Sequence, residues 1–72
     1  MIRSAIVETI NKQQGFYAPH VRTNISLAAI PEELIDKIQI GDHVMIFYSE
    51  KLIYGGFKSI VIETPRAKLT DL

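Results

Sequence analysis

Apolar and polar residues alternate along much of this chain with the two-residue period of a β-strand. Residues 4–10, SAIVETI, are rich in Ile, Val and Thr and predict a first strand. Residues 20–30 alternate most regularly and predict a half-buried strand. The apolar face of that strand would consist of Val21, Thr23, Ile25, Leu27 and Ala29. Residues 16–20 could extend it, but Pro19 cannot donate a ladder hydrogen bond and restricts the extension to an edge, a bulge or a break.

A short helix is predicted near 31–38, where the alternation gives way to apolar residues every four positions. Pro31 suits the first helical position, and Glu32 and Glu33 in the first turn complement the helix dipole. The residues that would cover one side of this helix are Ile30, Leu34 and Ile38. So short a helix depends on packing rather than on intrinsic propensity.

Gly41 and Asp42 predict a corner, because Gly adopts unusual backbone angles and Asp bonds nearby backbone groups. The following strand, 43–48 (HVMIFY), is apolar on both faces, which is typical of a strand that is covered on both sides. In so small a chain, the second cover would be the short helix or another subunit. Further on, Gly55 and Gly56 separate two apolar stretches and predict a two-residue hairpin.

Short strands at roughly regular spacing favour a barrel, which also protects strand edges. We therefore expect a mainly β protein: a small five-stranded OB-like or SH3-like barrel with one short helix near 31–38. The helix would lie between strands two and three or between strands three and four. A single domain over 1–64 would be followed by a frayed polar tail over 65–72.

Composition narrows the function classes. The chain has 72 residues, enough for one domain, and no cysteine, which excludes disulfides, zinc–thiolate sites and a cysteine nucleophile. Lys plus Arg and Asp plus Glu both number 8, and this zero balance lowers the odds of nonspecific nucleic-acid binding without excluding a local basic patch. Neither a signal peptide nor a membrane span is visible, so we expect a cytoplasmic protein.

The order of two strands, IPEEL, GDHVMIFY and a further strand is similar to that of small OB-like barrels over most of the chain. The stretch from Ile25 to Tyr48 also resembles the middle of the small hydrogenase-maturation chaperones. That family acts through a cysteine directly after the initiator methionine, where this chain has Ile2. The resemblance therefore implies a barrel and not a role in metal delivery.

A second family resemblance concerns DNA binding. The stretch from Ile30 to Ile53 is similar to the swapped-hairpin family of antitoxins and transition-state regulators, and the matching residues are Ile30, Pro31, Leu34, Ile40, Gly41, Asp42 and Val44. In that family, basic residues and a glycine before the proline meet DNA. Here the corresponding strand has Arg22 as its only charge, so the scaffold half matches and the DNA-reading half does not.

No catalytic constellation is evident. His20 and His43 are far apart in sequence, and His43 fits an exposed strand entrance better than a metal site. The acidic residues Glu32, Glu33 and Asp36 fit a solvated helix face better than a cation loop. We expect no enzyme activity, metal or cofactor, although a small enzyme subunit completed by a partner is a third alternative.

Binding is the favoured function. Our first hypothesis is protein–protein interaction, either in a homo-oligomer or with a larger protein, through the two-sided strand: Val44, Met45, Ile46, Phe47 and Tyr48. The alternative is nucleic-acid binding, in which aromatic rings stack on bases and cations hold phosphates. An OB-like barrel would use Phe16, Tyr17, Arg22, Asn24 and Lys58, whereas a swapped-hairpin dimer would use the Arg22 strand.

Overall fold

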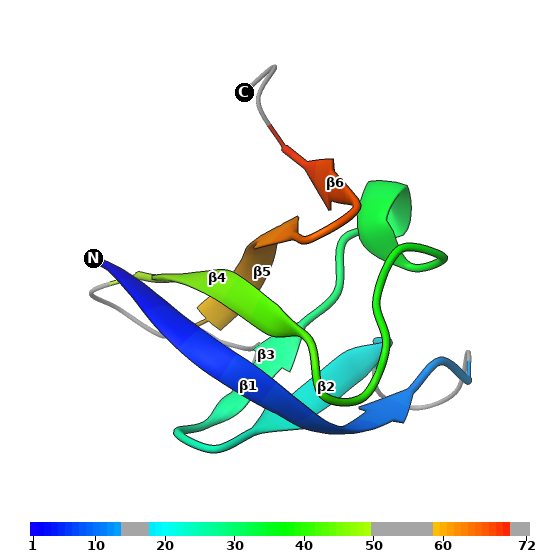
Figure 1. Ribbon diagram of the computed structural model, residues 1–72, viewed down its shortest axis with the longest axis horizontal. Helices are drawn as coiled ribbons and strands as arrows, with labels where there is room; N and C mark the ends of the chain where they lie inside the picture. The colour runs from blue at the N-terminus through cyan, green and yellow to red at the C-terminus, as the bar shows by residue number, and fades with distance from the viewer. Residues whose placement is uncertain (14–17, 50–58, 70–72) are drawn as a thin grey trace.

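Strands account for most of the residues that the computed structural model describes, which are 1–13, 18–49 and 59–69. In chain order the elements are β1 (Ile2–Asn11), β2 (His20–Thr23), β3 (Leu27–Ala29), the 3₁₀ helix η1 (Glu32–Leu34), β4 (His43–Tyr48), β5 (Ser59–Thr64) and β6 (Ala67–Lys68). Figure 1 shows the strands curving around one interior, with η1 to one side of β5. The predicted hairpin at Gly55 and Gly56 lies outside the described residues.

The sheet closes on itself. Its strand order is β3-β2-β1-β4-β5-β6, and a further parallel pairing between Ala29 of β3 and Ile60 of β5 joins the two sides. The other pairings are antiparallel. The predicted mainly β, five-stranded barrel is therefore confirmed, with β6 as a short extension beyond β5. The short helix lies between β3 and β4, one of its two predicted positions.

β1 is long enough to belong to both halves of the barrel. Its first half, Ile2–Ile6, pairs with β4, and its second half, from Val7 to Asn11, pairs with β2. The register with β2 shifts between Val7 and Thr9, which is the kind of irregularity that bends a strand. This bend carries β1 from one side of the barrel to the other (Figure 1).

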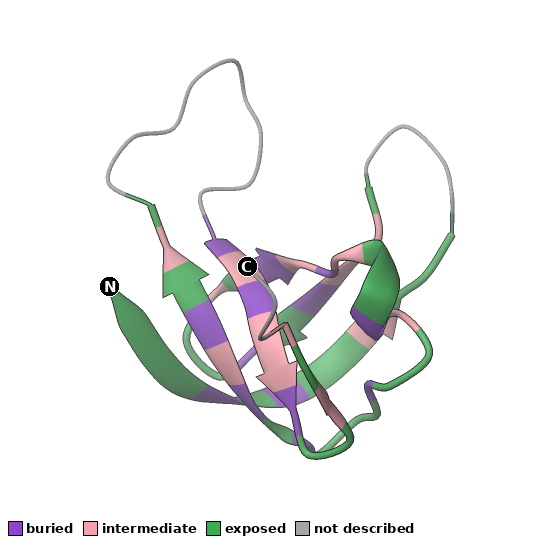
Figure 2. Cartoon of the chain, turned by 90° about the horizontal axis from the view of Figure 1, so that it is seen from above, coloured by how far each residue is buried: buried purple, intermediate pink, exposed green. Residues whose placement is uncertain are grey.

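The interior is filled by alternate residues of the five barrel strands and by the segment around η1. Figure 2 shows buried and more exposed bands alternating along β4 and β5. The buried hydrophobic residues are Ala5, Val7, Val21, Ala28, Ile30, Leu34, Ile38, Val44, Ile46 and Val61. This alternation is the pattern expected of strands with one face on a core.

The prediction of one continuous strand over 20–30 is wrong. A turn after Thr23 separates β2 from β3, and the buried face changes phase across it, so Leu27 is exposed while Ala28 is buried. The Thr23 hydroxyl explains the turn. It donates to the Ser26 carbonyl (2.7 Å) and accepts from the backbone N–H groups of Ile25 (3.2 Å) and Ser26 (3.0 Å). Such local side-chain bonds compete with a continuing strand.

The segment near 31–38 is helical only over Glu32–Leu34, and Pro31 precedes the helix in an extended conformation instead of occupying its first turn. The predicted packing is confirmed, since Ile30, Leu34 and Ile38 are all buried. Burial of these side chains holds a helix that is too short to be stable alone.

The predicted corner is confirmed, because Gly41 has a φ of 91°, which L-residues rarely adopt.

The predicted fraying is wrong for residues 65–69. Lys68 of β6 pairs with Glu63 of β5, and the Leu69 N–H donates to the Ile62 carbonyl at 2.9 Å. The chain therefore folds back along β5 after Thr64.

Candidate docking face

β4 contributes one face to the core and one to the outside of the barrel. Val44 and Ile46 are fully buried among the core residues. Met45 and Phe47 lie on the other face of the strand, where Met45 is half-buried and Phe47 is 41% exposed. Tyr48 is half-buried, and its hydroxyl lies 2.6 Å from the Ser26 Oγ. Of the five residues predicted for an interface, Met45 and Phe47 are thus on the outer face.

Strand register extends this outer face sideways. Phe47 pairs with Ile2 of β1 on one side and with Ile60 of β5 on the other. Paired residues in neighbouring strands project from the same face of a sheet, so the three side chains form one row, which we call the outer row. Ile2 is 53% exposed and Ile60 is half-buried.

An apolar groove continues from the outer row toward η1. It has a volume of about 430 Å³ and is lined by Pro31, Glu33, Phe47, Ile60, Ile62 and Leu69. The backbone bond between Leu69 and Ile62 brings the Leu69 end of this lining to β5. The groove therefore exists because the segment after β5 folds back along that strand.

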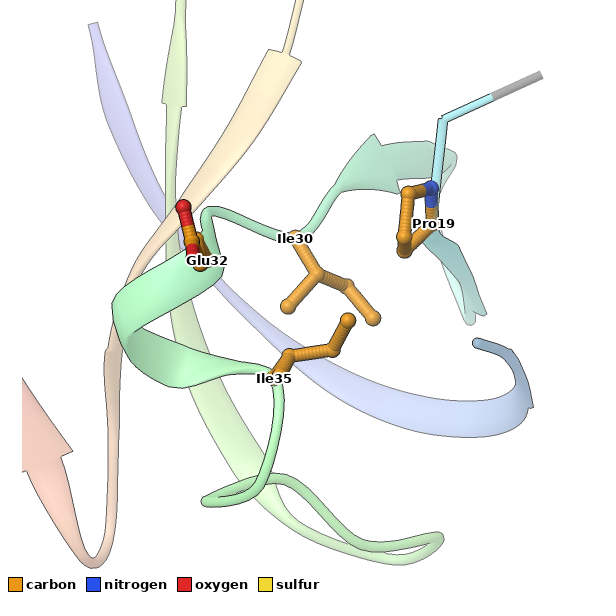
Figure 3. A pocket seen from close by; sticks show the side chains of 4 residues that line it. All are labelled: Pro19, Ile30, Glu32 and Ile35. Carbon is orange, nitrogen blue, oxygen red and sulfur yellow. The ribbon is translucent and has the colours of Figure 1, made fainter. Parts of the chain in front are cut away.

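A second hollow lies on the other side of η1. It has a volume of about 390 Å³ and is lined by Pro19, Ile30, Glu32 and Ile35. In Figure 3 the Ile30 and Ile35 side chains extend toward one another, while Glu32 points away from them. A backbone bond from Ile30 N–H to the Pro19 carbonyl (2.9 Å) ties the two walls together.

An ion pair between the buried Asp42 and the more exposed Arg66 fixes the opposite end of β4. The Asp42 carboxylate accepts from both terminal nitrogens of Arg66, at 2.6 Å (Nη1) and 3.3 Å (Nη2), and from the Gln39 backbone N–H at 2.8 Å. The Arg66 hydrogen bonds hold the pKa of Asp42 below its ordinary value of 3.8. They outweigh burial, which acts in the opposite direction, while the Gln39 N–H and the Arg66 charge lower this pKa further.

The histidines do not form a site. His43 is exposed at the start of β4 opposite Ile6, whereas His20 is half-buried on β2, with its Nδ1 3.0 Å from the Ala18 carbonyl. Among the residues that the structure describes, no group of three acidic or histidine side chains could hold a metal ion. Nor is any helix in these ranges long and apolar enough to cross a membrane.

The residues predicted to bind nucleic acid are only partly placed. Arg22 is exposed on β2, where it pairs with Thr9 of β1 and Leu27 of β3. The Asn24 side chain is engaged within the fold, because its Oδ1 accepts from the Ile6 N–H at 2.8 Å. The other predicted contacts lie outside the described residues, and these are Phe16, Tyr17 and Lys58.

The sequence prediction missed most of the outer face. Ile2 was predicted to belong to no strand, and Leu69 was assigned to the tail. Ile60 and Ile62 alternate with Val61 and so share one face of their strand, but the apolar run Ile60–Ile62 does not itself show which face is buried. No local sequence pattern shows that Ile60 and Ile62 lie near Phe47 and Pro31 in the folded chain.

Fold and face together define a small closed β-barrel with an apolar outer side. Comparison with known proteins adds no relative: no family model, no curated protein and no solved structure matches the chain.

Proposed function

We propose that this chain is a non-enzymatic assembly module, an OB-like barrel that docks onto another protein through its outer row and apolar groove. The OB-like assignment is supported by connectivity. β1 pairs with both β2 and β4, β3 closes onto β5 in parallel, and η1 lies between β3 and β4. This is a five-stranded barrel in a Greek-key order, a scaffold whose faces serve as binding surfaces.

One observation carries the docking proposal: Ile2, Phe47 and Ile60 form a continuous apolar row that leads into a groove. Single exposed apolar residues are ordinary on protein surfaces. A contiguous row with an aromatic side chain at its centre is typical of interaction sites, where aromatic anchors are enriched. A barrel of 72 residues also has a limited core of its own, so burial of this face by a partner would add to its stability.

Site-specific photo-crosslinking in cells tests this proposal. A photoreactive phenylalanine analogue would replace Phe47, and in a matched control it would replace Ile40, which is 68% exposed in the loop before β4. We expect discrete adducts with another protein from position 47 and none of the same mass from position 40. Adducts of equal yield from both positions would contradict the proposal. An adduct with the mass of two copies would identify self-association, and a nuclease-sensitive adduct would identify nucleic acid.

Nucleic-acid binding is the second candidate, and Arg22 supports it. This side chain is exposed at the centre of a three-strand row with Thr9 and Leu27, and it has no ion pair within the described residues. Titration with single-stranded and duplex oligonucleotides at low and high salt tests this candidate. Binding that Arg22→Glu abolishes and Phe47→Asp leaves intact would establish it in place of protein docking. Undetectable affinity at low salt would remove it.

A further inference from the structure

The first half of β1 has an unpaired edge. Barrel closure normally removes strand edges. Here β1 spans 10 residues, and β2 covers it only from Val7 onward, while β4 pairs with Ile2–Ile6 along the other edge. No other described strand pairs with Ile2–Ala5 on the β2 side. Among the described strands, the closed barrel therefore keeps a short open edge at the end of β1 that carries the outer row.

The hydrogen-bond phase shows which backbone groups face this edge. Met1 and Tyr48 exchange backbone bonds, with Tyr48 N–H to the Met1 carbonyl at 2.7 Å and the Met1 amino group to the Tyr48 carbonyl at 3.2 Å. Bonded and non-bonded pairs alternate in an antiparallel ladder, so Arg3 and Ala5 also bond β4, while Ile2 and Ser4 point away from it.

Bonds farther along β1 support this phase. Ile6, two positions after Ser4, faces away from β4 and exchanges bonds with Asn24, accepting from its backbone N–H at 3.1 Å and donating to its Oδ1 at 2.8 Å. Val7 points the other way and bonds Gly41 and Asp42. Asn24 thus satisfies the edge at Ile6, and within the described part of the chain the N–H and carbonyl groups of Ile2 and Ser4 remain open to an added strand.

A second copy of this chain fits the edge poorly. If Ile2 of one copy paired with Ser4 of the other, both Arg3 side chains would lie directly opposite each other, which is destabilising for like charges. If Ser4 paired with Ser4, Ile2 would face Ile6, whose backbone groups Asn24 already occupies. Arg3 has no ion pair or side-chain hydrogen bond within the described ranges, so a strand with a carboxylate opposite it would gain a partner.

We propose that Ile2–Ala5 receives an extended segment of another protein as an added antiparallel strand, with an acidic residue opposite Arg3 and apolar residues beside Ile2. This inference rests on the proposed docking function and specifies how the partner binds. Main-chain hydrogen bonds from Ile2 and Ser4 would provide affinity, while Arg3 and the outer row would select the side chains, as in strand addition generally.

The test uses the whole chain and an unbiased library of short displayed peptides. Selected binders are expected to alternate apolar and polar residues and to contain an acidic residue. Ser4→Pro removes one N–H on the open edge and leaves the ladder to β4 intact, since proline is tolerated where the N–H faces solvent. We expect it to weaken peptide binding about two- to tenfold, the range that one lost hydrogen bond of ordinary strength produces. Ser4→Ala, which keeps the N–H, should bind like the parent.

The second measurement reverses the charge at residue 3 and in the peptide, and it does not depend on introducing a proline. Arg3→Glu should lose the selected acidic peptides and bind the same peptides with lysine in place of the acidic residue. Circular dichroism and urea unfolding establish that each variant is folded before binding is measured. Peptides that bind Ser4→Pro and Arg3→Glu as well as the parent would overturn the inference, as would a library that yields no binder.

Two further outcomes separate this inference from the broader proposal. Peptides that lose affinity for Phe47→Asp but not for Ser4→Pro would leave protein docking standing and remove strand addition. Peptides affected by neither variant would count against both. Light scattering on the parent chain completes the test, because a dimer that Ser4→Pro dissociates would show that the edge takes a second copy instead.

Discussion

Removing the Arg66 guanidinium should destabilise the barrel measurably. Arg66→Met keeps the apolar stem but deletes both bonds to Asp42, whose side chain is only 9% exposed. Hydrogen bonds to a charged group contribute about 1.5–3 kcal/mol to stability. Because the Arg66 side chain is 40% exposed and partly screened by solvent, we expect a cost of about 1–2 kcal/mol. In a domain of this size, that corresponds to a fall in Tm of roughly 5–15 °C.

The chain provides its own control for this measurement. Lys68 and Glu63 form a second ion pair, with 3.9 Å between Nζ and Oε1 and with side chains that are 60% and 42% exposed. Lys68→Met should therefore change the free energy of unfolding by less than about 0.5 kcal/mol. Urea unfolding followed by far-UV circular dichroism measures both variants, since the chain has no tryptophan. A double-mutant cycle with Asp42→Asn then isolates the coupling between Asp42 and Arg66.

The effect should depend on pH in one direction. The pKa of Asp42 is lower in the folded chain than its ordinary value of 3.8, so the folded state binds this proton less tightly than the unfolded state does. The stabilisation is therefore fully present above that ordinary value and is lost as pH falls through the lowered pKa. The difference between parent and Arg66→Met should be constant from neutral pH to about pH 5 and should shrink below about pH 4. A difference as small as that of Lys68→Met, or one that persists undiminished in strong acid, would refute this reasoning.

Substitutions at three further positions test the local structure by urea unfolding. Gly41→Ala should cost about 1–2 kcal/mol, because φ is 91° there although no neighbour blocks an added Cβ, and Gly41→Asn should cost less. Thr23→Val should cost about 1–3 kcal/mol by removing the hydroxyl that holds the β2–β3 turn, and a neutral result would show that the turn forms without it. Leu34→Ala should cost about 2–5 kcal/mol, since this side chain at the end of η1 is fully buried; a cost near that of an exposed substitution such as Ile40→Ala would contradict the packing described.

Local patterns in the sequence were enough to predict the strands at 4–10 and 43–48 and the corner at Gly41, because each depends on neighbouring residues. The β2–β3 turn escaped prediction for the opposite reason. Apolar residues continue to alternate through Ile25 and Leu27, and no glycine or proline interrupts them. The turn instead depends on one hydroxyl that bonds three backbone groups, and alternation cannot reveal this.

The outer face could not be derived in the same way, because its parts are distant in sequence. Phe47 was singled out within its apolar strand, yet the groove beside it requires Pro31 and Leu69, which only barrel closure brings near. The ion pair could not be predicted for the same reason. Asp42 was predicted at a corner, but its partner Arg66 lies 24 residues away, in a segment that was predicted to be a frayed tail. The groove and the ion pair therefore both depend on contacts between residues that are distant in sequence.

The two ends of β4 differ in how tightly they are bonded to the rest of the barrel. At the His43 end, the Asp42–Arg66 pair and the bonds from Val7 to Gly41 and Asp42 join three segments of the chain. At the Tyr48 end, β1 extends past β2 and its edge is open. An edge that receives a partner's strand, as proposed above, must stay accessible without loosening the fold, and the ion pair holds the barrel together at the far end from that edge. Because the ion pair and the edge share no residue, Arg66→Met and Ser4→Pro should act independently, one on unfolding and the other on binding.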